Sequence, residues 1–344
     1  MLDKECFENA IKNVMDMSLK EIDEKANLSV YEEYAKKISV PTQFERLKNA
    51  RSRFKERTPL HVYLTIGEAK KEKGMISFDL RYRGQSVAKI KVGRDSDAVM
   101  LRVDKDHAEH NRNFSDNTMQ SDIITKPLET DWNSKTAERF RSYFKLNPER
   151  YSEKKKNEEH RIESQLLSEF SKKCGKNKSI IYIQPIKIAG CRFPMTTAVS
   201  ASKVWKEGSI KAGNGKGGGI DILARTRKGN QNYLTVIEVK DENKNNEPPE
   251  AAVCQASAYA AFLQRLLRSK VGQIWWNLFG MSGNLPESLV IRIACAMPKN
   301  NESASFAAIC KSMDRLPIGD SRDLVEVHAI FFDKNVNPVI HTFY

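Results

Sequence analysis

The chain lacks an apolar run long enough to cross a bilayer, and its first residues lack the basic-then-apolar order of a signal peptide. Its six cysteines form no Cys-x-x-Cys pair. A chain of 344 residues is also large enough to fold without disulfides. These absences argue against a secreted disulfide scaffold and a paired-cysteine metal site. They predict a cytoplasmic protein without a membrane segment.

Acidic residues are in the minority, because 57 lysines and arginines face 44 aspartates and glutamates, giving a net charge of +13. The excess is uneven: residues 1–150 hold 29 basic and 25 acidic side chains, and residues 151–344 hold 28 and 19. Clustered basic side chains gain affinity for phosphate backbones through counterion release, which favours nucleic acid as a partner. Simple solubility is the alternative explanation.

Two motifs that first suggest a nucleotide or metal site lack essential parts. The glycine-rich residues 213–219 precede a predicted strand, and they lack the spacing and the Ser or Thr of a phosphate-binding loop. His107 and His110 lie in a polar stretch without the cysteines or third histidine of a zinc site. The sequence therefore predicts neither nucleoside triphosphate hydrolysis nor structural zinc.

Two short apolar runs predicted as strands carry charged side chains. Residues 219–224 contain Asp221, and residues 233–240 contain Glu238 and Lys240. The turn-like residues 228–230 join the runs into a hairpin that brings Asp221 near Glu238. Alternate side chains of a strand share a face, so Glu238 and Lys240 project together. A charge in a packed strand is costly unless it is paired or binds a metal.

These charges predict a divalent-metal site. The carboxylates of Asp221 and Glu238, with the backbone carbonyl of Val239, supply the hard oxygen ligands that suit Mg²⁺ or Mn²⁺. Lys240 is left to act on substrate or water. The alternative is an ion-paired hairpin with Glu238 and Lys240 as a solvated pair on an edge strand. The position of Asp221 in a glycine-led apolar run argues against that alternative.

The same residues resemble the PD-(D/E)XK nuclease superfamily, in which an Asp, a second acid and a Lys on adjacent strands hold metal and hydrolyse phosphodiesters. The resemblance implies that Asp221, Glu238 and Lys240 are catalytic. One position departs from the pattern, because Ile220 stands where the family has proline before the Asp. This change leaves the ligands intact.

Two predicted helices flank the hairpin and extend the resemblance. Residues 158–170 form an amphipathic helix whose Glu163 corresponds to the helical glutamate of the superfamily, with Glu159 as the fallback. The resemblance implies a metal or outer-shell role for Glu163. Gln255 and Tyr259 share one face of a helix over residues 250–268 and match the Gln-x-x-x-Tyr helix of the RecB-like branch. That match implies that they line the active site and orient the phosphate.

The resemblance covers about residues 155–300 and implies an α/β fold, a restriction-endonuclease-like mixed sheet flanked by helices. It implies a Mg²⁺- or Mn²⁺-dependent deoxyribonuclease, with DNA favoured over RNA and a restriction or defence role. Two alternatives stay open. The chain can be a nucleic-acid-binding protein that keeps the fold without turnover, or an assembly subunit of a larger complex.

We predict two domains, an N-terminal α+β domain over residues 1–150 and the nuclease-like domain over residues 151–344. Helices are expected within residues 3–57 and 134–144, and a small antiparallel sheet from runs at 61–66, 75–82, 86–92 and 98–103. Basic side chains in this region suit contacts with phosphates, so nucleic-acid recognition is one interpretation. A solvated surface, a lid or a dimer arm is the alternative, so a homodimer stays open.

Basic and aromatic side chains near the predicted hairpin give two further expectations. Trp275 and Trp276 favour buried packing over base stacking. A basic loop around the glycine run can clamp a phosphate backbone, or it can be a plain connection without a binding role. Its predicted nucleic-acid-binding residues are Lys203, Lys206, Lys211 and Lys216.

Overall fold

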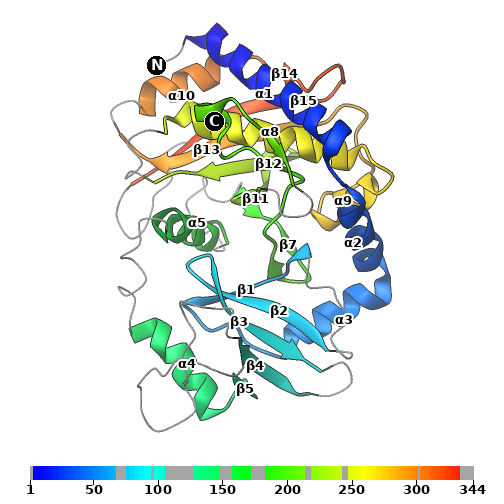
Figure 1. Cartoon of the computed structure of the whole chain (residues 1–344), viewed down its shortest axis with the longest axis vertical. Coiled ribbons are helices and arrows are strands. Elements are labelled where there is room, and N and C mark those ends of the chain that lie inside the picture. The colour runs from blue at the N-terminus through cyan, green and yellow to red at the C-terminus, as the bar shows by residue number, and fades with distance from the viewer. Residues whose placement is uncertain are drawn as a thin grey trace. The chain divides into compact units, whose positions relative to one another are not determined.

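The computed structural model describes residues 3–66, 75–93, 97–104, 128–146, 157–171, 183–213, 218–241, 247–300 and 303–333 (Figure 1). The chain is a mixed α/β protein that divides into two compact units. Unit 1 comprises Met1–Lys36, Gln165–Ile186 and Pro194–Tyr344, and unit 2 comprises Lys37–Ser164 and Lys187–Phe193.

Unit 1 is built on a six-stranded mixed sheet in the order β14-β15-β13-β12-β11-β6. Strand β12 runs parallel to β13, and β13 runs parallel to β15, while β11 is antiparallel to both β12 and β6. The strands are β6 (Ile183–Pro185), β11 (Ile222–Lys228), β12 (Gln231–Val239), β13 (Val290–Pro298), β14 (Leu316–Pro317) and β15 (Leu324–Phe332). The predicted hairpin is confirmed, because Gly229 adopts a φ of 59° in the two-residue turn between β11 and β12.

Helix α8 (Pro249–Leu267) is the central helix of unit 1 and packs on β12 and β13 (Figure 1). Nearly all of its residues are buried. Its many alanine and leucine side chains allow close contact with the sheet and with α1. Trp275 and Trp276 of α9 are also buried, which confirms their predicted packing role. The other regular elements of unit 1 are α1 (Lys4–Lys25), β9 (Val199–Ser200), α7 (Val204–Glu207), β10 (Lys211–Ala212), α9 (Gly272–Leu278) and α10 (Ser303–Ser312).

A buried charged network lies on the central strands of this sheet. Arg292 of β13 is 1% exposed, and its guanidinium lies 3.2 Å from the Glu326 carboxylate and 3.9 Å from the ring centre of Tyr233. Glu326 also lies 2.8 Å from both His328 and Arg315. Because a buried charge needs compensation, these contacts allow Arg292 to sit inside the fold.

Unit 2 contains a seven-stranded sheet in the order β5-β4-β3-β2-β1-β8-β7. Neighbouring strands are antiparallel except for the parallel pair β1 and β8. The elements are α3 (Pro41–Ser52), β1 (Leu60–Tyr63), β2 (Ile76–Tyr82), β3 (Gln85–Val92), β4 (Val99–Val103), β5 (Leu128–Asp131), α4 (Lys135–Leu146), β7 (Lys187–Ile188) and β8 (Cys191–Arg192). The antiparallel sheet predicted from the sequence is thus observed with three additional strands.

Helices α2 (Ser29–Ser39) and α5 (Asn157–Phe170) each continue across the division between the units. The division therefore differs from the predicted boundary near residue 150. Helix α1 belongs to unit 1, because its apolar stripe packs along α8 and the rings of Phe7 and Phe306 lie 5.8 Å apart. An apolar stripe shows that a helix must be covered, and it leaves the covering partner undefined.

Among the residues that the structure describes, none of the helices has the length and apolar character required to span a bilayer.

Candidate functional site

The hairpin of β11 and β12 brings Asp221 and Glu238 to the same place on the sheet. The final residue pair of the ladder is Ile222 with Ile237, and Asp221 and Glu238 each lie one residue beyond it. Directly opposed residues of an antiparallel pair project from the same face. Continuing the register by one residue sets Asp221 opposite Glu238, where the sequence predicted that the hairpin would bring the two acids near each other.

A backbone contact fixes Asp221 at the end of its strand. The N–H of Val239 donates to the Asp221 Oδ2 over 2.8 Å. Val239 is the residue whose carbonyl was predicted to be a metal ligand, so its peptide already lies against the first carboxylate. The next residue, Lys240, is held by its own backbone N–H, which donates to the carbonyl of Ala296 over 2.9 Å.

Glu238 occupies the most enclosed position of the candidate site. Strand β12 lies between β11 and β13, and the Glu238 side chain is 0% exposed. Burial raises the pKa of the Tyr259 phenol, and the negative charges of Glu238 and Asp221 raise it further. The Tyr259 hydroxyl of α8 therefore lies within the electrostatic influence of both carboxylates.

Lys240, Gln255 and Tyr259 form a continuous polar chain beside the two acids. The Lys240 ammonium donates to the Gln255 Oε1 over 3.3 Å, and the Gln255 Nε2 donates to the Tyr259 hydroxyl over 3.4 Å. The side chain of Lys240 is only 6% exposed. The helical face predicted for Gln255 and Tyr259 is thus the face that meets Lys240.

Gly218, near the end of the glycine run, lies against Tyr259, and the sequence did not predict this contact. A Cβ atom at Gly218 would lie 2.3 Å from the Tyr259 hydroxyl and 3.1 Å from the carbonyl of Val199. The Gly218 N–H also donates to that carbonyl over 3.0 Å. A run of glycines before an acidic strand is the signal that could have indicated this close backbone approach.

Glu247 is a second residue that the sequence analysis missed. One carboxylate oxygen lies 3.4 Å from the Lys240 ammonium, and the other lies 3.4 Å from the ammonium of Lys206. Its position directly before Pro248 and Pro249, at the start of α8, is the available sequence signal. The two prolines stop the helix from extending toward the N-terminus, so Glu247 lies just outside the start of α8.

The four lysines predicted to clamp a phosphate backbone do not share one loop. Lys203 precedes α7 and lies 2.7 Å from Glu207, whereas Lys206 lies within α7 and contacts Glu247. Lys211 is exposed on β10. Lys216, like His107 and His110, lies outside the described residues. Lys203 and Lys206 are therefore separated from the glycine run by the rest of α7 and by β10.

Glu163 lies on α5, as predicted, in the part of the chain that belongs to unit 2. Its carboxylate is 3.4 Å from the Nδ1 of His160, one turn earlier. A role for Glu163 beside the two strand acids stays a prediction.

The donor set of unit 1 fits a hard divalent cation in part. Among the described residues, no three His, Cys, Asp or Glu side chains are grouped closely enough to hold a metal ion. Mg²⁺ is usually held by one or two carboxylates and keeps several of its waters. Asp221 and Glu238 supply such carboxylates, and the adjacent carbonyl of Val239 can add a third oxygen.

One face of the sheet in unit 2 is polar and basic. The registers place His61 opposite Arg81, and Tyr63 opposite both Asp79 and Arg192. Burial lowers the pKa of Lys187, and the charge of Arg192 lowers it further, which indicates a positive local potential. The same alternation places further cations on this face: Lys89, Lys91 and Arg102.

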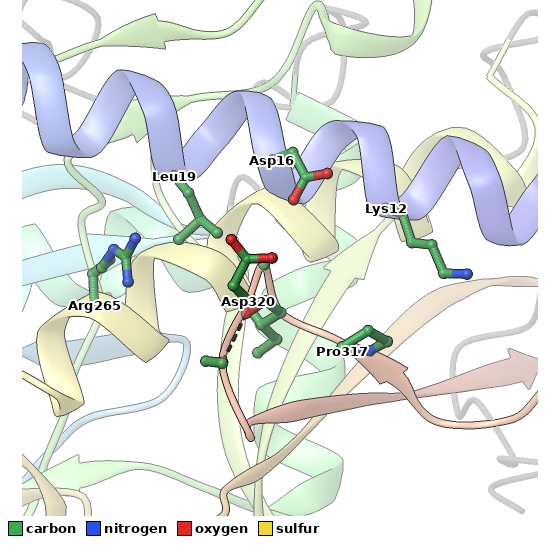
Figure 2. A pocket seen from close by; sticks show the side chains of 9 residues that line it. Lys12, Asp16, Leu19, Arg265, Pro317 and Asp320 are labelled. Atoms are coloured by element: carbon green, nitrogen blue, oxygen red, sulfur yellow. Dashed lines mark hydrogen bonds between the residues drawn. The ribbon is translucent and has the colours of Figure 1, made fainter.

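A cavity of about 560 Å³ lies elsewhere in unit 1 and contains none of the predicted site residues. Figure 2 shows Lys12 and Asp16 on helix α1 above the loop that carries Asp320, with Arg265 at one side. Arg265 also pairs with Asp23 over 2.7 Å. The polar lining holds charges of both signs, so it indicates no particular ligand.

Comparisons of the chain with protein-family models, with curated proteins and with solved structures found no match.

Proposed function

We propose that the chain is a metal-dependent nuclease of the PD-(D/E)XK type, with a restriction-endonuclease-like sheet in unit 1. The observation that carries this proposal is the β11–β12 register, which sets Asp221 opposite Glu238, with the buried Lys240 two residues after Glu238. The secondary structure around them agrees with the resemblance, because the acids lie on adjacent strands and the Gln-x-x-x-Tyr helix follows the Glu-x-Lys strand.

In the proposed mechanism the side chains at the end of the β11–β12 hairpin position a cation and a phosphodiester. Asp221 and Glu238 would hold the cation with the carbonyl of Val239. The chemistry that Mg²⁺ or Mn²⁺ supplies when bound is Lewis-acid polarisation of a phosphoryl oxygen and acidification of water. Lys240, held in a dry position by its neighbours, orients the attacking water and stabilises the negative charge that develops on phosphorus oxygens.

In this mechanism Gln255 and Tyr259, both on α8, orient the phosphate. Their mutual contact links two polar side chains of α8 to Lys240. Fixed donors lower the barrier because they need no reorganisation when charge develops. Duplex DNA is the substrate that the resemblance favours, and restriction or defence is the corresponding role. The net charge of +13 supports a polyanionic substrate.

The test is a cleavage assay with supercoiled and linear DNA in Mg²⁺, Mn²⁺ or EDTA. Wild type is expected to cleave only with metal, and Asp221→Asn and Lys240→Ala are expected to lose at least about 100-fold in rate. Lys228→Ala, which changes an exposed lysine of the same hairpin, is the matched control and should retain the rate. Equal cleavage by wild type and all three variants would show that the activity does not arise from this site.

The net charge of +13 also fits a second candidate function, a nucleic-acid-binding or assembly protein that retains the fold without turnover. In that case wild type binds DNA in EDTA with an affinity that falls steeply with salt, and it leaves the DNA intact when Mn²⁺ is added. Binding and cleavage together would favour the nuclease.

A further inference from the structure

The two carboxylate oxygens of Glu247 contact two different lysines, one buried in the site and one at the surface. Its Oε2 lies 3.4 Å from the Lys240 ammonium, and its Oε1 lies 3.4 Å from the Lys206 ammonium. The Lys240 side chain is 6% exposed, whereas that of Lys206 is 55% exposed. Glu247 thus connects the interior of the candidate site with its outer edge.

The backbone around Glu247 holds this carboxylate in place. Pro248 is the N-cap of α8, and Pro249 is the first residue of the helix. Proline fixes its own φ and restricts the residue before it to extended conformations, so Glu247 has little backbone freedom. It also lies beside the N-terminus of a 19-residue helix, where the helix dipole favours negative charge.

The Lys240 ammonium meets neighbours of two different kinds, an amide and a carboxylate. Gln255 accepts from it as a neutral amide at 3.3 Å, and Glu247 meets it as a carboxylate. The side chain of a lysine has four rotatable bonds, so a single contact leaves its position poorly defined. The contact from Glu247, two residues before α8, and the contact from Gln255, in its second turn, together restrict where the ammonium lies.

We propose that Glu247 is a positioning residue for Lys240 and, through its second oxygen, for Lys206. This inference rests on the proposed function, because it assigns Lys240 to the reacting phosphate. Lys206 is placed to be the first cation of the site that an arriving phosphodiester meets. When a phosphate oxygen takes over Lys206, Glu247 remains with Lys240 and keeps its ammonium in position.

The test compares Glu247→Gln with Glu207→Gln. Glu207 is the matched control, because it also pairs with a lysine of the α7 region, Lys203 at 2.7 Å, and it has no contact with Lys240 among those described. Reductive methylation with isotopic formaldehyde, read by peptide mass spectrometry, reports how readily each lysine leaves its contacts. We expect Glu247→Gln to raise the labelling rate of Lys240 about tenfold, and Glu207→Gln to leave it unchanged.

Cleavage kinetics provide the functional readout. Glu247→Gln should lower kcat about tenfold with KM within about twofold, and it should add no further loss in a Lys240→Ala background, because the two residues act together. Glu247→Asp keeps the charge and should return both the labelling and kcat toward wild type. This variant also separates a local effect from loss of folding.

The outcomes distinguish the two proposals. Unchanged labelling of Lys240 in Glu247→Gln, or an equal loss of rate with and without Lys240, would overturn the positioning role. If wild type cleaves no DNA but the labelling rises only in Glu247→Gln, the nuclease proposal fails and the contact between Glu247 and Lys240 is upheld.

Discussion

Gly218→Ala offers a strong test of the site, because the structure fixes the size of the perturbation. An added Cβ would lie 2.3 Å from the Tyr259 hydroxyl, whereas ordinary contacts begin near 3.4 Å. One of the two must therefore move by about 1 Å. The Tyr259 side chain is 1% exposed, and the Gly218 backbone N–H is hydrogen-bonded to the Val199 carbonyl, so neither residue can move freely. Overpacking of this kind costs about 1–3 kcal/mol of stability.

Misplacement of a catalytic group by about 1 Å can reduce the rate about 100-fold, and we expect a loss of that order in metal-dependent DNA cleavage. Gly219→Ala is the neighbouring control. Its added Cβ meets nothing nearer than the Met195 carbonyl at 3.9 Å. Initial rates and urea unfolding of both variants provide the measurement. If Gly218→Ala cleaves within threefold of Gly219→Ala and has the same free energy of unfolding, the reasoning about Tyr259 is wrong.

Three other predictions concern the charged groups of unit 1. Glu326→Gln should lower the free energy of unfolding by about 3 kcal/mol in urea denaturation, because it leaves the charge of buried Arg292 uncompensated. His328 and Arg292 lower the pKa of Glu326 to about 2 from 4.5. The stability advantage of wild type over this variant should therefore be complete above pH 4.5 and be lost as the pH falls toward 2. A difference that is equal at pH 2.5 and pH 7 would contradict this linkage. Asp221→Asn should weaken Mn²⁺ binding in calorimetry while changing stability by less than about 1 kcal/mol, because its amide oxygen still accepts from Val239. A large loss of stability would assign Asp221 a structural role instead.

Local chemistry made the hairpin of unit 1 predictable. Residues 222–228 and 231–239 have strand-forming side chains, and Gly229 can adopt the positive φ that the tight turn needs. Given that turn, the register follows, and with it the placement of Asp221 opposite Glu238. The i, i+4 spacing on a helix likewise predicted that Gln255 and Tyr259 share a face.

Contacts between distant segments were not predictable in the same way. Helix α1 has a clear apolar stripe, yet it packs along α8, more than 200 residues later, which moved it from the predicted N-terminal domain into unit 1. The partners of the predicted basic residues were unpredictable for a related reason. The sequence shows where the lysines are, but it does not show which acid each one pairs with. Lys203 pairs with Glu207, and Lys206 pairs with Glu247 because α7 lies near the start of α8.

By itself, the sequence determined the hairpin of β11 and β12, the first four strands of unit 2 and the helix that carries Gln255 and Tyr259, because these follow from side-chain periodicity and turn chemistry within a few residues. Only the tertiary structure decided that Glu247 lies against Lys240 and that Gly218 abuts Tyr259. Such contacts depend on the packing of α8 against the sheet and on the path of the chain before β11. Packing is set by the shapes of all the surfaces that meet, and no local pattern contains that information.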